Sequence, residues 1–282
     1  MTRLAEIQAH IGSMGELRDI VGAMRSLAGM RVQEAQHALP GISRYADAMA
    51  AAIGGALLLM PQSAAETRAD RDGLALILYT AEHGFVGGFN ERLIEAAEAA
   101  LAPEDALFVL GTRGGALALE RGRRVIWMEP MATRLAAVPE TIRRLSGEIY
   151  ARIARGQISR VEAMFARCRQ GGAATIERSL LLPLDLEKLQ AKETRQEPLH
   201  NLEPQALLEK LMSEYVFALL TKAAVESLAS ENAARFAAME SAHDNVSAKL
   251  DKLRQDEREA RQSEITTELL ELITGAEALR EE

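Results

Sequence analysis

The last third of the chain, from Glu203 to about Leu279, constrains the fold more than any other stretch. It contains no proline after Pro204 and no glycine before Gly275. Apolar residues recur at every third or fourth position, and good helix formers fill most of the remaining positions. We therefore predict one helix of about 70 residues or more, which is about 110 Å long at about 1.5 Å per residue. A compact globule of this size is only about 50 Å across. Such a helix must extend beyond it, and its apolar stripe needs a partner.

A second helical pattern covers residues 2–39, where apolar residues follow steps close to a heptad repeat. Three glycines interrupt it and mark either close helix–helix approach or weak points: Gly12, Gly15 and Gly22. We expect Pro40 and Gly41 to kink or break the helix, because proline lacks an amide hydrogen and clashes with the preceding turn. The pattern resumes at Ile42 and stops before Pro61. Residues 1–60 are therefore predicted to form an N-terminal shaft helix that is kinked near residue 40.

The middle of the chain alternates between short apolar runs and helical patterns. Residues 61–73 are polar and aperiodic, as in a linker. Beyond them we predict strands at 74–82, 106–111, 123–129, 158–168 and 174–184, with the last two joined at Gly171 and Gly172, and helices at 90–101, 113–121 and 139–155. The alternation is typical of a small doubly wound, Rossmann-like domain with a mainly parallel sheet and one antiparallel edge. This α/β domain is predicted to cover residues 74–200.

The predicted fold class is therefore α/β plus a long antiparallel coiled coil. The shaft helices, 1–60 and 201–282, lie at the two ends of the chain, and the α/β domain is inserted between them. Winding the two helices together buries both apolar stripes. The N-terminal helix is too short to cover the last turns of its partner, which are apolar on more than one face: Leu269, Leu270, Leu272 and Ile273. An exposed apolar tip implies a protein socket.

Composition and motifs exclude several classes of function. The net charge of -8 argues against a general nucleic-acid-binding surface. The single cysteine, Cys168, excludes an internal disulfide and is typical of a reducing compartment. The longest apolar run, residues 49–60, is too short and too rich in glycine to span a bilayer. The five histidines show no metal-ligand spacing, and no set of residues assembles a catalytic site, so we expect no metal, no cofactor and no catalytic residue.

The motif HGFVGGFN, residues 83–90, lies where a phosphate-binding loop would lie, between a predicted strand and a predicted helix. It does not match G-x-G-x-x-G, and it has no Lys-Ser/Thr pair and no nearby basic residue aimed at an anion. We interpret it as a tight structural turn through Gly84 and Gly87, with Asn90 near the helix N-cap. Two alternative functions stay open here: an α/β enzyme that binds a nucleotide or small molecule and carries a coiled-coil arm, and a free-standing coiled-coil scaffold.

Three polar residues fall at or near the apolar seam of the long helix: Asn232, His243 and Glu257. They either specify the register of the helix pair or mark positions that face other subunits.

Several stretches resemble the gamma subunit of F-type ATP synthases. ASENAARFAAMESAHDN (229–245) and ARQSEITTELLELITGAEAL (260–279) are similar to the two C-terminal signatures of that family. Residues 6–36 resemble its opening helix, HGFVGGFN its Gly-Leu-Cys-Gly-x-x-Asn turn, and LEPQALLEKL (202–211) the start of its C-terminal helix. The resemblance covers about 1–60, 74–92 and 200–280 and is weak between them.

This resemblance implies a central rotor shaft with no catalytic site of its own. One copy would lie inside a ring of three alpha and three beta subunits. The α/β domain would form a foot, with the epsilon subunit, on the membrane-embedded ring of c subunits. The chain would touch the membrane only through that c-ring, on the cytoplasmic face of a bacterial inner membrane. Ion flow would turn the shaft and drive ATP synthesis in the beta subunits, or ATP hydrolysis in reverse.

The resemblance also implies contact residues, matched position by position. Met24 and Arg25 match the part of the opening helix that faces an acidic lever of a beta subunit. Five residues of the last helix match positions that touch the alpha/beta ring: Arg235, Arg261, Gln262, Thr266 and Glu268. Leu202, Glu203 and Pro204 match the foot near the c-ring or epsilon subunit.

The sequence departs from the family pattern at several points. The opening helix of the family is usually rich in Lys and Arg, whereas residues 1–60 hold five arginines and five acidic residues. Glu240 replaces a usual lysine, His243 a usual threonine, and Val86 the cysteine of the turn. These departures predict a divergent member, with a weaker attraction to an acidic beta lever or with a partner that has co-adapted.

Overall fold

The computed structural model describes residues 3–60, 73–102, 105–168, 174–189 and 199–278, with side chains of the last helix up to Ile273. The chain divides into two compact units. The paired-helix unit comprises Met1–Leu27 and Phe236–Glu282, and the α/β unit comprises Ala28–Arg235. The boundary therefore cuts both long helices, whereas the domain limits expected from the sequence follow the ends of the secondary-structure elements. The expected linker, 61–73, lies almost wholly outside the described residues.

The long C-terminal helix is confirmed. Helix α6 runs without interruption over Pro204–Ala278, which is 75 residues. It begins at Pro204, a favoured first residue because its missing amide hydrogen would have no partner inside the helix. Leu279, the expected end, lies outside the described residues.

The N-terminal helix is uninterrupted at Pro40. Helix α1 covers Arg3–Leu57 and continues through this proline, so of the two expected outcomes, a kink or a break, the break does not occur. A proline inside a helix costs about 3 kcal/mol, and here packing on both sides offsets that cost. Ala35 and Ala46 are buried, and Leu39 packs against the core of the α/β unit.

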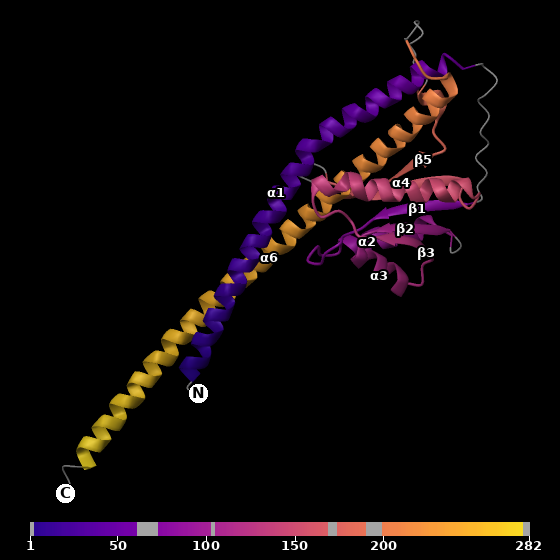
Figure 1. Cartoon of the computed structure of the whole chain (residues 1–282). Helices are drawn as coiled ribbons and strands as arrows, with labels where there is room; N and C mark the ends of the chain where they lie inside the picture. The colour runs from indigo at the N-terminus through magenta and orange to yellow at the C-terminus, as the bar shows by residue number, and fades with distance from the viewer. Residues whose placement is uncertain (1–2, 61–72, 103–104, 169–173, 190–198, 279–282) are drawn as a thin grey trace. The chain divides into compact units, whose positions relative to one another are not determined.

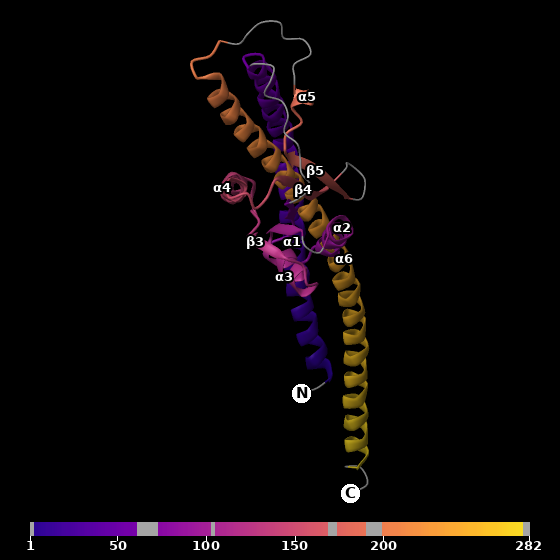
Figure 2. The ribbon, with the colours of Figure 1, turned by 90° about the vertical axis from the view of Figure 1, so that its right-hand side faces the viewer.

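The paired-helix unit consists of the first part of α1 and the last part of α6, which run antiparallel (Figures 1 and 2). Gln8 Nε2 donates to Glu257 Oε1 at 3.1 Å, and further along α1, Gly22 lies opposite His243, which comes earlier in α6. Three apolar residues of this unit are buried: Val21, Met239 and Leu250. A methyl group added at Gly12 or Gly15 would meet no atom within 4 Å, so neither glycine marks a close helix contact.

The α/β unit contains a five-stranded sheet of order β3-β2-β1-β4-β5. The strands are β1 (Leu74–Tyr79), β2 (Ala106–Leu110), β3 (Val125–Glu129), β4 (Arg160–Arg167) and β5 (Thr175–Leu182). All neighbours pair in parallel except β4 and β5, which are antiparallel. The predicted strand positions and the antiparallel edge are therefore confirmed, while the Gly171-Gly172 junction lies outside the described residues.

Helices cover both faces of this sheet, as a doubly wound fold requires. Alternate side chains of β1 point to opposite faces, so Ile77 joins one hydrophobic core and Leu76 the other. The first core includes α4 (Val138–Ala154) and the first part of α6, and the second includes α2 (Phe89–Ala100) and α3 (Thr112–Glu120) (Figure 1). A 3-10 turn (Leu135–Ala137) precedes α4, and a short helix α5 (Leu186–Leu189) follows the sheet.

Docking on the sheet explains why the α/β unit includes parts of both long helices. Ala35 of α1 and a run of α6 residues belong to the first core, among them Val216, Leu220, Ala224 and Leu228. Of the helices that the structure describes, none is both long and apolar enough to cross a bilayer.

Candidate functional site

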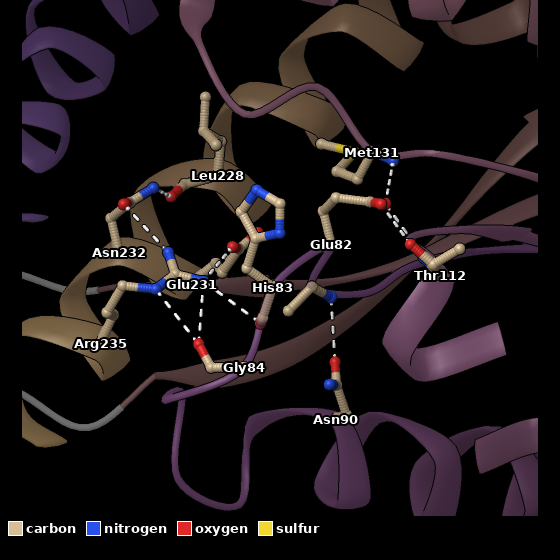
Figure 3. Close-up of polar contacts among 11 residues, drawn as sticks. Glu82, His83, Gly84, Asn90, Thr112, Met131, Leu228, Glu231, Asn232 and Arg235 are labelled. Atoms are coloured by element: carbon tan, nitrogen blue, oxygen red, sulfur yellow. Dashed lines mark hydrogen bonds and ion pairs between the residues drawn. The ribbon is translucent and has the colours of Figure 1, made fainter. Parts of the chain in front are cut away.

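A group of polar contacts lies at the carboxyl ends of the parallel strands of the α/β unit. Strand β1 has β2 on one side and β4 on the other, so the order of the strands reverses there. α/β folds commonly bind ligands in the crevice at such a switch point. Residues 80–90, which follow β1, occupy this edge, and Figure 3 shows their polar contacts.

Glu82 fills the position at which a phosphate could bind. Its carboxylate accepts hydrogen bonds from the Thr112 backbone N–H at 3.1 Å, from the Thr112 hydroxyl and from the Met131 N–H at 3.0 Å. Thr112 is the first residue of α3, and helix N-termini attract anions. Burial raises the pKa of Glu82, but the bonds from Thr112 and Met131 outweigh that effect and lower it overall. The chain therefore supplies its own anion to this helix.

Thr80 and two glycines close the rest of the crevice. A Cβ added at Gly114 would lie 2.2 Å from the Thr80 side chain, and one at Gly111 would lie 2.5 Å from the Thr80 carbonyl oxygen. Gly111 also has a φ of +108°, which strongly favours glycine. The start of α3 thus packs directly against the end of β1 and leaves no space for a ligand between them.

Asn90 holds the turn in a way that the sequence did not predict. The N-cap of α2 is Gly88, and Asn90 lies two residues after it, near the N-cap as expected. Asn90 is buried in the first turn, and its Oδ1 accepts a hydrogen bond from the Ala81 N–H at 2.9 Å. The turn itself passes through Phe85, with φ of 62°, and Gly87, with φ of 55°. This segment forms the turn between β1 and α2.

Arg235 of α6 reaches this turn from the other side (Figure 3). Its guanidinium donates to the His83 and Gly84 carbonyl oxygens at 3.3 and 3.4 Å, to Glu231 Oε1 at 2.7 Å and to Asn232 Oδ1 at 3.2 Å. The side chains of Arg235 and Glu231 are only 9% and 6% exposed. Burial raises the pKa of Glu231, and the guanidinium of Arg235 partly offsets that effect.

The position of Arg235 and its neighbours corrects three expectations from the sequence. A basic residue does lie beside the turn, although it donates to carbonyl oxygens and not to an anion. The buried Arg235 is not presented on the surface, which argues against the predicted contact with a ring of partner subunits. Asn232 is equally buried and donates to the Leu228 carbonyl oxygen at 2.8 Å, so it serves the internal packing of α6.

Other polar residues of α6 bind the ends of the strands. Ser227 Oγ donates to the Tyr79 carbonyl oxygen at 3.1 Å, and Ser230 Oγ donates to the Ala166 carbonyl oxygen at 2.9 Å. The Tyr79 hydroxyl in turn donates to the Leu220 carbonyl oxygen at 3.2 Å. A signal for this role was present in the sequence, because residues 226–235 place Ser, Glu, Asn and Arg among alanines in a strongly predicted helix.

A different surface lies near the end of α6, in the paired-helix unit. Four apolar residues spaced as one helix face are 52–70% exposed: Ile265, Leu269, Leu272 and Ile273. The Gln8–Glu257 contact sets the antiparallel register of the two helices. It places Arg3, the first described residue of α1, level with about residue 262 of α6. Helix α1 therefore does not extend along this face, and the predicted bare apolar tip is confirmed (Figure 2).

The remaining predicted contact residues are at least partly accessible. Met24 and Arg25 are half-buried on α1. Four residues on α6 are exposed: Arg261, Gln262, Thr266 and Glu268. Arg261 pairs with Glu257 at 2.9 Å, and Thr266 Oγ1 donates to the Gln262 carbonyl oxygen at 2.8 Å. These residues belong to the paired-helix unit, whereas Leu202, Glu203 and Pro204 belong to the α/β unit. Leu202 and Glu203 are exposed just before α6, and Pro204, its first residue, is half-buried.

Two hollows in the described α/β unit lie beside the end of β5, away from the carboxyl ends of the parallel strands. Each is about 320 Å³, and they are lined partly by Pro183 and Tyr215, and by Tyr150 and Met212. Across the described ranges, no group of three His, Cys, Asp or Glu residues is arranged to bind a metal ion. The fold defines the class of protein: a chain with a long helix at each end and an α/β domain inserted between them in the sequence, with exposed apolar residues near the end of α6.

Comparison with known proteins identifies the family. The model of the ATP synthase family matches residues 3–279, and the chain therefore belongs to this family. The ATP synthase gamma chains of Paracoccus denitrificans and Moorella thermoacetica are 29% and 27% identical, and each alignment covers 99% of this chain and 100% of the relative. The resemblance to gamma subunits is thus confirmed.

Solved structures support the fold. A chain of the Euglena gracilis mitochondrial ATP synthase, in a structure of OSCP, F1 and the c-ring, has a TM-score of 0.64 and 14% identity, and the match covers 98% of this chain and 94% of that chain. A chain from the central stalk and c-ring of the Tetrahymena thermophila enzyme has a TM-score of 0.54 and 16% identity, covering 79% and 99%.

Proposed function

We propose that this chain is the central rotor shaft of an F-type ATP synthase and carries no catalytic site of its own. The observation that carries the proposal is the exposed apolar face of α6 beyond the start of α1, in a chain of the gamma family. Such a face needs a protein socket. Rotation of an asymmetric shaft in that socket favours a different conformation of each catalytic subunit in turn, because each orientation makes different contacts.

The partners that we propose are a ring of three alpha and three beta subunits for the paired-helix unit, with one copy of this chain per ring. Met24 and Arg25 would face a beta lever, and the exposed α6 residues Arg261, Gln262, Thr266 and Glu268 would touch the ring. Leu202, Glu203 and Pro204, at the start of α6, would contact the c-ring or the epsilon subunit. The chain would then lie peripherally at the cytoplasmic face of a bacterial inner membrane, attached through the c-ring.

The alternative of a nucleotide-binding enzyme loses its candidate site. Glu82 occupies the N-terminus of α3, and the glycines at the start of α3 pack against Thr80. A nucleotide phosphate would have to displace a charged side chain that is already bound by three hydrogen-bond donors.

Co-assembly tests the proposal. We expect the chain, mixed with the alpha and beta subunits of its own complex, to form one species at three alpha, three beta and one copy of this chain. The variant Leu269→Ser/Leu272→Ser should weaken the coupling of ATP hydrolysis to ion pumping. The matched control Leu119→Ser, an equally exposed leucine on α3, should not. Recovery of this chain only as a monomer or homodimer, or wild-type coupling in the tip variant, would count against the proposal.

A further inference from the structure

Residues 80–90 are hydrogen-bonded to other parts of the α/β unit on three sides, and we call this segment the strand-end bracket. Glu82 ties it to the start of α3 and to Met131. Asn90 ties the start of α2 back to Ala81. Arg235 ties α6 to the carbonyl oxygens of His83 and Gly84 (Figure 3). The bracket thus connects the shaft helix with the sheet edge and with both helices that follow β1 and β2.

We propose that Arg235 is a positioning residue of the rotor, which locks α6 to the strand-end bracket so that the helix cannot turn about its own axis on the sheet. The inference rests on the proposed function, because a lock against rotation matters only in a helix that carries torque. Arg235 contacts no substrate in this role. It acts by holding the helix through which force passes between partner subunits and the α/β unit.

The place of Arg235 along α6 supports this role. Arg235 is the last residue of the α/β unit, and the same helix continues from Phe236 into the paired-helix unit. Torque that is carried by α6 itself therefore passes through the backbone at this residue before it reaches the sheet, while α1, which also enters both units, is a second route. Hydrogen bonds made by Arg235 resist a twist of α6 before force reaches the part of the helix that packs on the sheet.

The chemistry of the docked surface explains why polar fastenings are needed. The apolar surface of α6 that packs on the sheet contains small residues, among them Ala223, Ala224 and Ala229. Dispersion contacts between such residues have no directional preference, so they resist a rotation of the helix only weakly. Hydrogen bonds are directional and weaken steeply when they bend. Ser227, Ser230 and Arg235 together bind the ends of β1 and β4 and the bracket over more than two helical turns.

Arg235 differs from the two serines because its guanidinium is held in place before it meets the bracket. Glu231 and Asn232, one turn earlier on the same helix, accept two of its hydrogen bonds. Arg31 of α1 contributes a further positive charge near Glu231. The planar fork can therefore donate to His83 and Gly84 with little loss of side-chain entropy.

The test uses the complete ATP synthase complex reconstituted in vesicles. The variant Glu231→Leu/Arg235→Met removes the bonds to the bracket and leaves no buried charge unpaired. The matched control is Glu148→Leu/Arg152→Met, an i,i+4 ion pair on α4 that also donates to a carbonyl oxygen, that of Ile126, but is bonded to no residue of α6. The readouts are ions pumped per ATP hydrolysed and the torsional stiffness of the rotor in single-molecule rotation.

We expect the Arg235 double variant to assemble and hydrolyse ATP, with a pumping ratio that is lower by at least about twofold and a softer rotor. The control should keep the wild-type ratio and stiffness. Arg235→Lys, which keeps the charge beside Glu231 but cannot donate to the same set of acceptors, should lie between them.

A wild-type pumping ratio and stiffness in the Arg235 double variant would overturn the inference, as would an equal loss in the control. If the double variant does not fold, wild-type values in Arg235→Lys would overturn it. In each of these cases the wild-type complex still assembles and pumps, so the proposed function survives. Failure of the wild-type chain to assemble would refute the proposed function instead.

Discussion

The buried pair of Glu231 and Arg235 leads to a stability prediction with a clear sign. In Arg235→Met, Glu231 loses the partner that lies 2.7 Å away, while its own side chain is only 6% exposed. Removing one member of a buried ion pair costs about 3–5 kcal/mol. Arg31 still offsets part of the charge, so we expect a free-energy loss near the lower end of that range. The α/β unit spans 28–235, and for a domain of that size each kcal/mol shifts Tm by about 2–4 °C.

The double variant Glu231→Leu/Arg235→Met separates this charge effect from the lost contacts. It removes the three bonds to the His83 and Gly84 carbonyl oxygens, each worth at most about 0.5–1.5 kcal/mol, while apolar burial compensates part of the loss. We expect a loss of about 2 kcal/mol or less, which is smaller than that of the single variant. Urea unfolding of the isolated full chain, followed by circular dichroism, measures both values. Arg152→Met is the control, because its partly exposed pair should cost only about 1 kcal/mol or less.

The penalty in Arg235→Met should also depend on pH. Burial raises the folded-state pKa of Glu231 above its unfolded value, and loss of the guanidinium raises it further. The loss of stability is therefore present at pH values above the folded-state pKa of Glu231. It disappears as pH falls through that pKa, because the folded state can then hold the neutral Glu231 carboxyl. The stability deficit should be smaller at about pH 5 than at about pH 8. A deficit below about 1 kcal/mol at both pH values, or an equal loss in the double variant, would refute the reasoning.

Three further predictions concern other parts of the chain. Glu82→Gln should lose about 1.5–3 kcal/mol at neutral pH. The native chain should lose stability as pH falls below 4.5 and through the lowered folded-state pKa of Glu82, because that carboxylate becomes protonated. The variant should lack this loss, and urea midpoints at several pH values would measure the difference. Gly114→Ala should destabilise the chain by about 1–3 kcal/mol or more because its Cβ meets Thr80. Gly147→Ala, in open space on α4, should stabilise it by up to about 1 kcal/mol, and thermal unfolding of both variants would measure the two effects. Truncation after Glu264 should weaken coupling and leave some ATP hydrolysis, and fully coupled ATP synthesis by the truncated complex would contradict a torque role for the tip.

Much of the fold follows from local sequence patterns. The period of apolar residues and the absence of Pro and Gly predicted α6 over nearly its full length. Short apolar runs predicted β1 and β2, because a strand buried on both faces is apolar throughout. The other three strands were also predicted, although each carries charged residues. Pro40 shows the limit of such patterns. A local rule allows a kink or a break there, and it does not include the packing of Leu39 against a core formed by distant residues, where the helix continues.

The polar contacts at the strand ends could not be predicted from local sequence patterns. Arg235 and Gly84 are 151 residues apart, and no local pattern indicates that one donates to the other. The family signature around Arg235 identified the family correctly. The role carried over with it, contact with a surrounding ring, conflicts with the burial of that side chain. A matched motif shows that a residue type recurs, but its burial is a property of the folded chain.

The sequence by itself determined the class of this protein: two long helices with apolar stripes, an α/β domain between them in the sequence, and apolar residues on more than one face near the end of the last helix. These features depend on periodicity, length and propensity, which are local properties of the chain. The tertiary structure alone decided that Glu82 closes the ligand crevice and that Arg235 fastens the shaft helix to the sheet edge. Both roles depend on which buried groups meet across long sequence separations, where hydrogen bonds and charges gain their energy from surroundings that the local sequence does not specify.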